Sequence, residues 1–194
     1  TLRVRLPGWA REEPVPGGLY RFENPHGQQA VIRVNGEPVH PPLEKGYAVM
    51  DRKWQEGDVV ELALPLPVRR VVARHEVEAN RGRVALQRGP LVFAAEWPDF
   101  EDHSVLDIVL DGQEDLEAVS GEDLPARMLV LQGMVKGSRL TEAGDTVLVD
   151  KPFRAIPYYA WAHRGQGQMA VWLATGIKTA QPLPLAAGDP AKKE

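Results

Sequence analysis

The chain has 194 residues, of which 43% are hydrophobic, and this is enough apolar material for one large or two small folded domains. A formal net charge of −4 argues against a nucleic-acid partner, because phosphate binding requires a basic surface, and no apolar stretch has the length of a membrane span. The absence of cysteine excludes disulfides, thiolate zinc sites and a cysteine nucleophile within this chain.

Alternating apolar and polar residues predict strands with one buried face at the start of the chain. Leu2–Leu6 has this pattern, and Ala30–Val34 repeats it. Asn35-Gly36 follows, and this pair is typical of a two-residue hairpin because both central positions of a type I′ turn need positive φ. Val59–Leu64 alternates again until Pro65, which ends the strand or confines it to a sheet edge.

The rest of the chain continues with short strands separated by turns, and only Gln113–Val119 has any helical character. The further expected strands are Val68–Arg74, Arg83–Gln87, Leu91–Ala95, Val105–Leu110, Met128–Leu131, Thr146–Val149, Tyr158–His163 and Met169–Leu173. Many short strands with regular turn signals predict an all-β protein, an antiparallel β-sandwich or jelly roll with one or two sandwich domains.

The expected domain junction is Trp97-Pro98-Asp99. We therefore expect a β-sandwich domain over residues 1–97 and a second β-rich domain or extension over residues 98–180, whose acidic segment Asp99–Asp123 crosses the surface. Residues 181–194 are poor in core-forming side chains and are expected to form a flexible tail.

No metal site is expected. The five histidines are scattered, without the spacing of metal ligands. Alternate oxygen-bearing residues in Asp111–Glu117 could wrap calcium, but the segment lacks the glycine placement and the distal glutamate of an EF-hand, so a solvated acidic loop is favoured. Among the carboxylates, Glu96 at the end of a strand is the most distinctive, although nothing in its surroundings in the sequence marks it as catalytic.

Aromatic and arginine side chains are the candidate contact residues, either with sugar or with another domain. Trp54, Tyr159 and Trp161 could pack on the C–H faces of a sugar, with Arg164 holding hydroxyls; packing in the core or between domains is favoured. If Tyr158–His163 is a strand, Tyr159 and Trp161 share a face. Arg88, in the shaped turn Arg88-Gly89-Pro90, could reach a carboxylate of a partner domain or cap local carbonyls.

Several blocks of sequence, in a fixed order, resemble the β-rich half of the bacterial β-L-arabinofuranosidase family, glycoside hydrolase family 127, formerly a domain of unknown function. The blocks are LRVRLPGWA (Leu2–Ala10), VNGEPV (Val34–Val39), GYAVMDRKW (Gly46–Trp54), KWQEGDVVELALP (Lys53–Pro65), GRVALQRGPLVFAAE (Gly82–Glu96), IPYYAWAHR (Ile156–Arg164) and MAVWL (Met169–Leu173). Several ordered blocks are more specific than any one of them.

The resemblance implies a protein whose catalytic half is a helical barrel followed by β-sandwich domains. In this family a cysteine nucleophile at a zinc site and an acidic acid/base lie in the helical half, and no position here matches them. The chain is therefore expected to be a non-catalytic accessory region without a cofactor, packed on an (α/α) barrel. The alternatives are a free-standing carbohydrate-binding module and a structural dimerisation module. The expected partners are its own barrel or a dimer mate, with glycans as a further ligand; a bacterial, cytoplasmic location is favoured over secretion.

Overall fold

The computed structural model describes residues 1–124 and 128–185. The strands are β1 (Leu2–Arg5), β2 (Tyr20–Phe22), β3 (Val31–Val34), β4 (Glu37–Val39), β5 (Leu43–Glu44), β6 (Tyr47–Met50), β7 (Val60–Ala63), β8 (Val68–Ala73), β9 (Arg83–Arg88), β10 (Leu91–Glu96), β11 (Ile108–Val109), β12 (Leu116–Gly121), β13 (Met128–Leu140), β14 (Thr146–Pro157), β15 (Met169–Ala170), β16 (Leu173–Ala174) and β17 (Leu183–Pro184). Short 3₁₀ turns occur at Gly8–Arg11, Glu78–Asn80, Trp97–Asp99 and Tyr158–Ala160. The expected all-β class with mostly antiparallel pairing is confirmed. Within the described part of the chain, no helix combines the length and apolar character needed to span a membrane.

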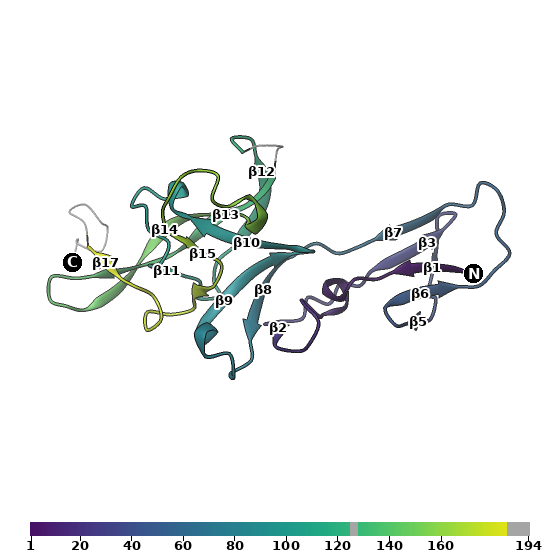
Figure 1. The fold of residues 1–194 in the computed structure, drawn as a ribbon, viewed down its shortest axis with the longest axis horizontal. Helices are drawn as coiled ribbons and strands as arrows, with labels where there is room; N and C mark the ends of the chain where they lie inside the picture. The colour runs from purple at the N-terminus through teal and green to yellow at the C-terminus, as the bar shows by residue number, and fades with distance from the viewer. Residues whose placement is uncertain (125–127, 186–194) are drawn as a thin grey trace.

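The first unit is a small sandwich at one end of the molecule (Figure 1). Two three-stranded sheets, β1-β6-β5 and β4-β3-β7, pack around a core that includes Ile32, Val34 and Met50. The hairpin expected at Asn35-Gly36 is confirmed, since β3 pairs with β4 across it and φ is 54° and 84° at the two turn residues.

The second unit is a ring of strands with additional strands at its margins. Its pairings run β9–β10–β14–β13–β11–β16 and return to β9, so the sheet closes on itself. The interior holds the largest core, with side chains from β9, β10, β13 and β14 together with Phe100, Val105 and Leu110. The hairpin β13–β14 supplies two long strands of this unit, of 13 and 12 residues (Figure 1).

Strand β2 joins the two units. Although it lies early in the chain, it pairs with β8 at the margin of the second sheet. Phe22 is buried there against Val71 and Ala85, and Trp9 packs on the same cluster. The guanidinium of Arg69 lies 3.5 Å from the centroid of the Phe22 ring.

Arg69 also binds the segments on both sides of β2. Its Nη1 and Nη2 donate to the Glu12 carboxylate at 3.0 and 2.6 Å, and Nη2 donates to the carbonyl of Asn24 at 2.6 Å. Arg69 is itself 7% exposed, so its charge is removed from water and needs these partners. The connection between the units is therefore held by a bidentate ion pair in which Arg69 is buried and Glu12 is exposed.

The hydrophobic cores do not change at Trp97, where the domain junction was expected, but earlier in the chain. The apolar cluster of the first unit extends to Leu62, whereas Phe93 before Trp97 and Phe100 after it belong to one core. Strands β9 and β10 therefore pack with the elements that follow them.

Three local expectations are wrong. The segment with helical character contributes strand β12, because Leu116 and Ala118 pack on the core while the backbone pairs with β13; tertiary packing overrides a weak helical preference. Tyr158–Ala160 is a 3₁₀ turn rather than part of a strand. The acidic segment is not a surface excursion, because Asp107 and its neighbour Ile108 are buried.

The segment expected to form a flexible tail begins inside the sheet. The Gln181 N–H donates to the Leu106 carbonyl at 2.9 Å, and β17 pairs in parallel with Arg139 and Leu140 of β13. The remainder of that segment, residues 186–194, lies outside the described residues.

The turn between β9 and β10 provides a test of the contact between the units. Gly89 has φ 56°, and a Cβ at this position would lie 2.4 Å from Cδ2 of Leu66 and close to Trp9. Gly36 has φ 84° but nothing near its Cβ position. Gly89→Ala should lower the free energy of unfolding by about 1–3 kcal/mol, from backbone strain and from the displacement of the Leu66 methyl group that packs there. Gly36→Ala should cost only about 1 kcal/mol. Urea unfolding measures both, and equal losses would contradict the tight contact at Gly89.

Candidate contact surface

The turn after β14 carries three exposed aromatic side chains. Tyr158, Tyr159 and Trp161 have 45%, 61% and 40% of their surface exposed. Side chains three residues apart are nearly eclipsed on a 3₁₀ turn, so Tyr158 and Trp161 stack, with ring centroids 6.2 Å apart and planes inclined by 19°. Trp161 therefore pairs with Tyr158, and the shared face expected for Tyr159 and Trp161 does not form.

A buried carboxylate holds this aromatic turn in place. Glu96, at the end of β10, is 2% exposed. Its Oε1 accepts a hydrogen bond from the Ala162 N–H at 2.9 Å, and its Oε2 accepts one from Arg164 Nε at 2.8 Å. Ala162 has φ 68°, a strained conformation for a residue with a side chain, so the hydrogen bond to its N–H fixes an otherwise unfavourable turn.

Arg164 is shared between two carboxylates. Its Nη1 and Nη2 donate to Asp99 at 2.8 and 2.7 Å, in addition to the contacts with Glu96. The hydrogen bond to Asp99 raises the pKa of Arg164, burial opposes this rise, and the Glu96 carboxylate adds to it. Arg164 therefore remains a cation, and both carboxylate oxygens of Glu96 are engaged as hydrogen-bond acceptors.

A cleft of about 410 Å³ lies beside the turn, lined by Glu96, Trp161, Ala162, Gly165, Gln166, Gly167 and Met169. The Gly165–Gly167 loop packs tightly on an indole, because a Cβ on Gly167 would lie 2.1 Å from Cδ1 of Trp97. The aromatic surface therefore borders a loop whose path is fixed by packing.

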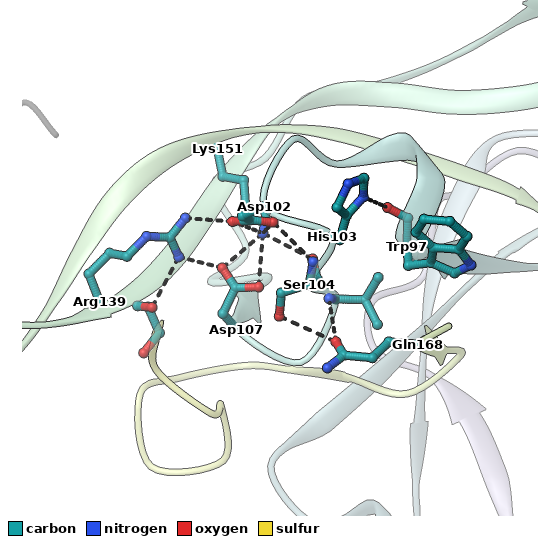
Figure 2. Close-up of polar contacts among 10 residues, drawn as sticks. Trp97, Asp102, His103, Ser104, Asp107, Arg139, Lys151 and Gln168 are labelled. Atoms are coloured by element: carbon teal, nitrogen blue, oxygen red, sulfur yellow. Dashed lines mark hydrogen bonds and ion pairs between the residues drawn. The ribbon is translucent and has the colours of Figure 1, made fainter. Parts of the chain in front are cut away.

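A second group of buried charges adjoins the first, as Asp99 and Asp102 line a common cavity. Figure 2 shows Lys151 and Arg139 of the β13–β14 hairpin facing Asp102 and Asp107. Lys151 Nζ lies 2.8 and 2.9 Å from the two Asp107 carboxylate oxygens and 2.9 Å from both of those of Asp102. It also donates to the Ser104 carbonyl at 3.0 Å.

Both central members of this group are removed from solvent, since Asp107 is 0% and Lys151 5% exposed. The loop that carries the carboxylates is anchored at its other side by Gln168, whose Oε1 accepts from the Ser104 hydroxyl at 3.3 Å (Figure 2). The same oxygen accepts from the Val105 N–H at 3.1 Å. The paired charges therefore bind the segment before β11 to the long hairpin.

The pKa of Asp102 is lowered by its partners. Burial raises it, but the hydrogen bonds from Lys151 and from the Ser104 N–H, with the charges of Lys151 and Arg139, more than offset burial. The ionised form of Asp102 is thus favoured in the folded protein.

The five candidate residues lie at three places. Arg164 joins Trp161 and Tyr159 at the aromatic turn. Trp54 packs on the core of the first unit, with the Arg52 guanidinium 5.2 Å from its ring centroid, and its indole N–H is buried without a hydrogen-bond partner among the described residues. Arg88 ends β9 next to the contact between the units, and no described residue hydrogen bonds to its guanidinium.

Sequence reasoning missed the charged residues that organise this region, which are Asp99, Asp102, Asp107, Arg139 and Lys151. The available signal was weak: an acidic segment and two long basic side chains inside apolar strands.

In the segment considered for calcium, Glu114 pairs with Arg70, and Asp111 accepts from the Gln113 N–H at 3.0 Å. Residues 1–124 and 128–185 contain no group of three or more potential ligands placed to hold a metal ion.

Family comparisons agree with this division into units. A model described as "Beta-L-arabinofuranosidase, GH127 middle domain" matches residues 1–66, and one described as "Glycoside hydrolase family 127 C-terminal domain" matches residues 68–174. The chain belongs to glycoside hydrolase family 127, of which it comprises the β-rich region that follows the helical catalytic half.

Related proteins share this region. A non-reducing end β-L-arabinofuranosidase of Bifidobacterium longum subsp. longum is 31% identical over 189 residues, which are 87% of this chain and 25% of that protein. A solved GH127 β-arabinofuranosidase superimposes with a TM-score of 0.85 at 36% identity, covering 94% of this chain and 28% of its own. A GH127 β-L-arabinofuranosidase from Geobacillus stearothermophilus T6 gives a TM-score of 0.70 at 38% identity, and the match covers 76% of this chain and 24% of that protein. The chain thus spans about a quarter of the length of the relatives it matches.

The zinc site implied by the family does not fit this chain. The cysteine nucleophile that the resemblance places at that site has no counterpart, because the chain contains no cysteine. No chemical step through zinc is therefore assigned to these residues.

The buried charge group predicts a large loss of stability when its lysine is removed. Lys151→Met keeps the side-chain length but leaves the Asp102 and Asp107 carboxylates facing each other with less positive charge. The expected loss is about 3–5 kcal/mol, as for other buried pairs that lose one partner. Lys136→Met is the matched control, because Lys136 pairs with Asp150 across the same two strands at the surface and should change stability little. Chemical denaturation measures both; similar effects would show that the burial of Lys151 does not matter.

The lowered pKa of Asp102 predicts a loss of stability in acid. A folded-state pKa below the ordinary value of 3.8 gives a contribution that is complete above that value and is lost as pH falls through the folded pKa. Asp102→Asn should therefore cost stability at about pH 6 and less at about pH 3. The measurement is urea unfolding at both pH values, and a pH-independent difference would contradict ionisation of Asp102 as the cause.

Proposed function

We propose that this chain packs against the catalytic (α/α) barrel of a β-L-arabinofuranosidase and supports the shape of that barrel. The chain is an accessory region of a glycoside hydrolase, as its family domains establish. Its relatives are about four times as long, and two of them are named as β-L-arabinofuranosidases. Without the cysteine nucleophile and zinc ligands, the chain by itself should hydrolyse no glycoside.

The observation that carries the proposal is the rigid, exposed aromatic turn. Tyr158 and Trp161 present a stacked apolar surface, with the more exposed Tyr159 next to them. Arg164 and Glu96 fix the turn from beneath, so that little conformational entropy remains to be lost on contact. Rigid aromatic side chains of this kind are the usual anchors of protein interfaces.

Sugar binding at the same turn has less support. A sugar site needs polar groups that converge on hydroxyls as well as an aromatic face. In the adjacent cleft both oxygens of Glu96 are engaged, by Ala162 and Arg164. Among the described lining residues this leaves the Gln166 amide and the Trp161 indole N–H to meet a ligand, and no charged group. Interdomain packing therefore accounts better for the exposed aromatic residues.

Substitution of Trp161 tests this proposal in two settings. In the 194-residue chain, Trp161→Ala should change stability by only about 0.5 kcal/mol, as is usual for surface positions. In the whole gene product, whose intact mass should be several-fold above 21.5 kDa, the same change should lower the thermal stability and weaken hydrolysis of p-nitrophenyl β-L-arabinofuranoside. Differential scanning calorimetry and initial rates are the measurements.

Leu43→Ala is the matched control, because Leu43 is a 48% exposed apolar residue on the first unit, away from the turn. Equal effects of both substitutions would contradict a specific interface. Loss of arabino-oligosaccharide binding with unchanged thermal stability would instead identify a carbohydrate-binding module. Loss of a concentration-dependent sedimenting dimer would identify a dimerisation surface.

A further inference from the structure

A cleft in the second unit collects arginine side chains from strands β2 and β9 and from the connection between β8 and β9. It has a volume of about 550 Å³ and lies where β2, β8 and β9 run side by side (Figure 1). Its lining includes Arg21 from β2, Arg74 at the end of β8, and Arg81 and Arg83 from the hairpin that leads into β9. Four guanidinium groups around one cleft contrast with the net charge of −4 of the whole chain.

Two of these arginines have no acidic partner among the described residues. Arg74 pairs with Glu76, and Arg81 pairs with Glu78. Glu23, the carboxylate among the lining residues, pairs with Arg70, which is outside the lining.

Arg21 and Arg83 donate only to main-chain carbonyls within residues 1–124 and 128–185. Arg21 Nη1 contacts the carbonyls of Phe22 and Glu23 at 3.3 and 3.4 Å. Arg83 donates to the carbonyls of Trp172 and Thr179 at 3.4 and 3.0 Å. A guanidinium has five N–H donors, so each retains donors and a full positive charge for a ligand.

The base of the cleft is held rigidly. The Gly82 carbonyl accepts from the Thr175 N–H at 2.9 Å, from the Thr175 hydroxyl at 3.0 Å and from the Thr179 hydroxyl at 2.9 Å. Gly82 has φ 66°, and a Cβ here would lie 2.7 Å from the Thr179 methyl group. Arg83, the next residue, therefore projects from a backbone that cannot easily shift, which favours binding by reducing the ordering cost.

We propose that this cleft binds a carboxylate-bearing sugar, such as a uronate residue of an acidic oligosaccharide. Planar guanidinium groups match the geometry of a carboxylate and bind it with two parallel hydrogen bonds. Asn80 and Thr175 line the same cleft. The Asn80 amide can meet sugar hydroxyls, and the Thr175 oxygen can accept from one while its proton is donated to the Gly82 carbonyl. The volume is within the range of about 300–1,000 Å³ that small ligands occupy. The sugar part of the inference depends on the proposed function in a glycoside hydrolase; the recognition of a carboxylate depends only on the arginines.

Titration calorimetry on the full chain tests the inference with three probes at constant ionic strength, trigalacturonate, neutral arabinotriose and inorganic phosphate. Trigalacturonate should bind, arabinotriose should not, and added salt should weaken the binding. Arg83→Gln and Arg21→Gln should each reduce the affinity about tenfold, the loss expected for one charge-assisted hydrogen bond. Arg21 is exposed, so its variant stays folded even if Arg83→Gln disturbs the base of the cleft.

Arg33→Gln is the matched control, since Arg33 is an exposed strand arginine of the first unit that donates to the Gly36 carbonyl at 3.2 Å. It should leave the affinity unchanged. Failure of trigalacturonate to bind, or equal losses in all three variants, would overturn the inference. Phosphate binding as tight as that of trigalacturonate would reduce the cleft to a general anion site and overturn the sugar assignment. The cleft shares no lining residue with the cleft beside the aromatic turn, so these outcomes are independent of the test on Trp161.

Discussion

Four carboxylates between Glu96 and Asp107 are held by cations of β13, β14 and the turn after β14, and the shape of the second unit depends on these pairs. Glu96 and Asp99 meet Arg164, while Asp102 and Asp107 meet Lys151 and Arg139. A buried charge is tolerated only when partners replace its lost hydration. The segment from Glu96 to Asp107 must therefore lie along the β13–β14 hairpin in the register that pairs each buried carboxylate with a cation. Because Glu96 also binds Ala162 and Arg164, the same register fixes the position of the aromatic turn.

The two units are connected by strand pairing as well as by the covalent chain. Strand β2 lies early in the sequence but pairs with β8, and Arg69 binds Glu12 on the approach to that strand. A strand shared in this way resists rotation of one unit against the other, because rotation would break main-chain hydrogen bonds and uncover Phe22. A region with this construction is suited to act as one stiff support.

Stiffness is the contribution that the proposed function asks of this accessory region. Catalysis requires reacting groups to be held within fractions of an ångström, and a barrel that is braced at its surface keeps its loops in place. The aromatic turn and the arginine cleft have no lining residue in common, so bracing a barrel and holding an acidic glycan need not compete. Together they would make the region both a support and a second point of contact with substrate.

Local sequence determined the strands that depend on neighbouring residues. The alternation in Leu2–Leu6 and the pair Asn35-Gly36 predicted a strand and a hairpin, because side-chain periodicity and turn φ angles are local properties. The ordered blocks of sequence likewise indicated the family, which the matches over residues 1–66 and 68–174 establish.

Tertiary structure alone decided how distant side chains meet. Lys151 and Asp107 are 44 positions apart, and Arg164 and Glu96 are 68 apart, so no local pattern connects them. The weak helical signal near Leu116 gave way to pairing with β13, and the expected strand at Tyr158 became a 3₁₀ turn. The sequence thus determined the extended segments that have clear alternation or turn signals, and the family to which they belong. The tertiary structure determined which charges are buried together, because burial is a property of the whole fold.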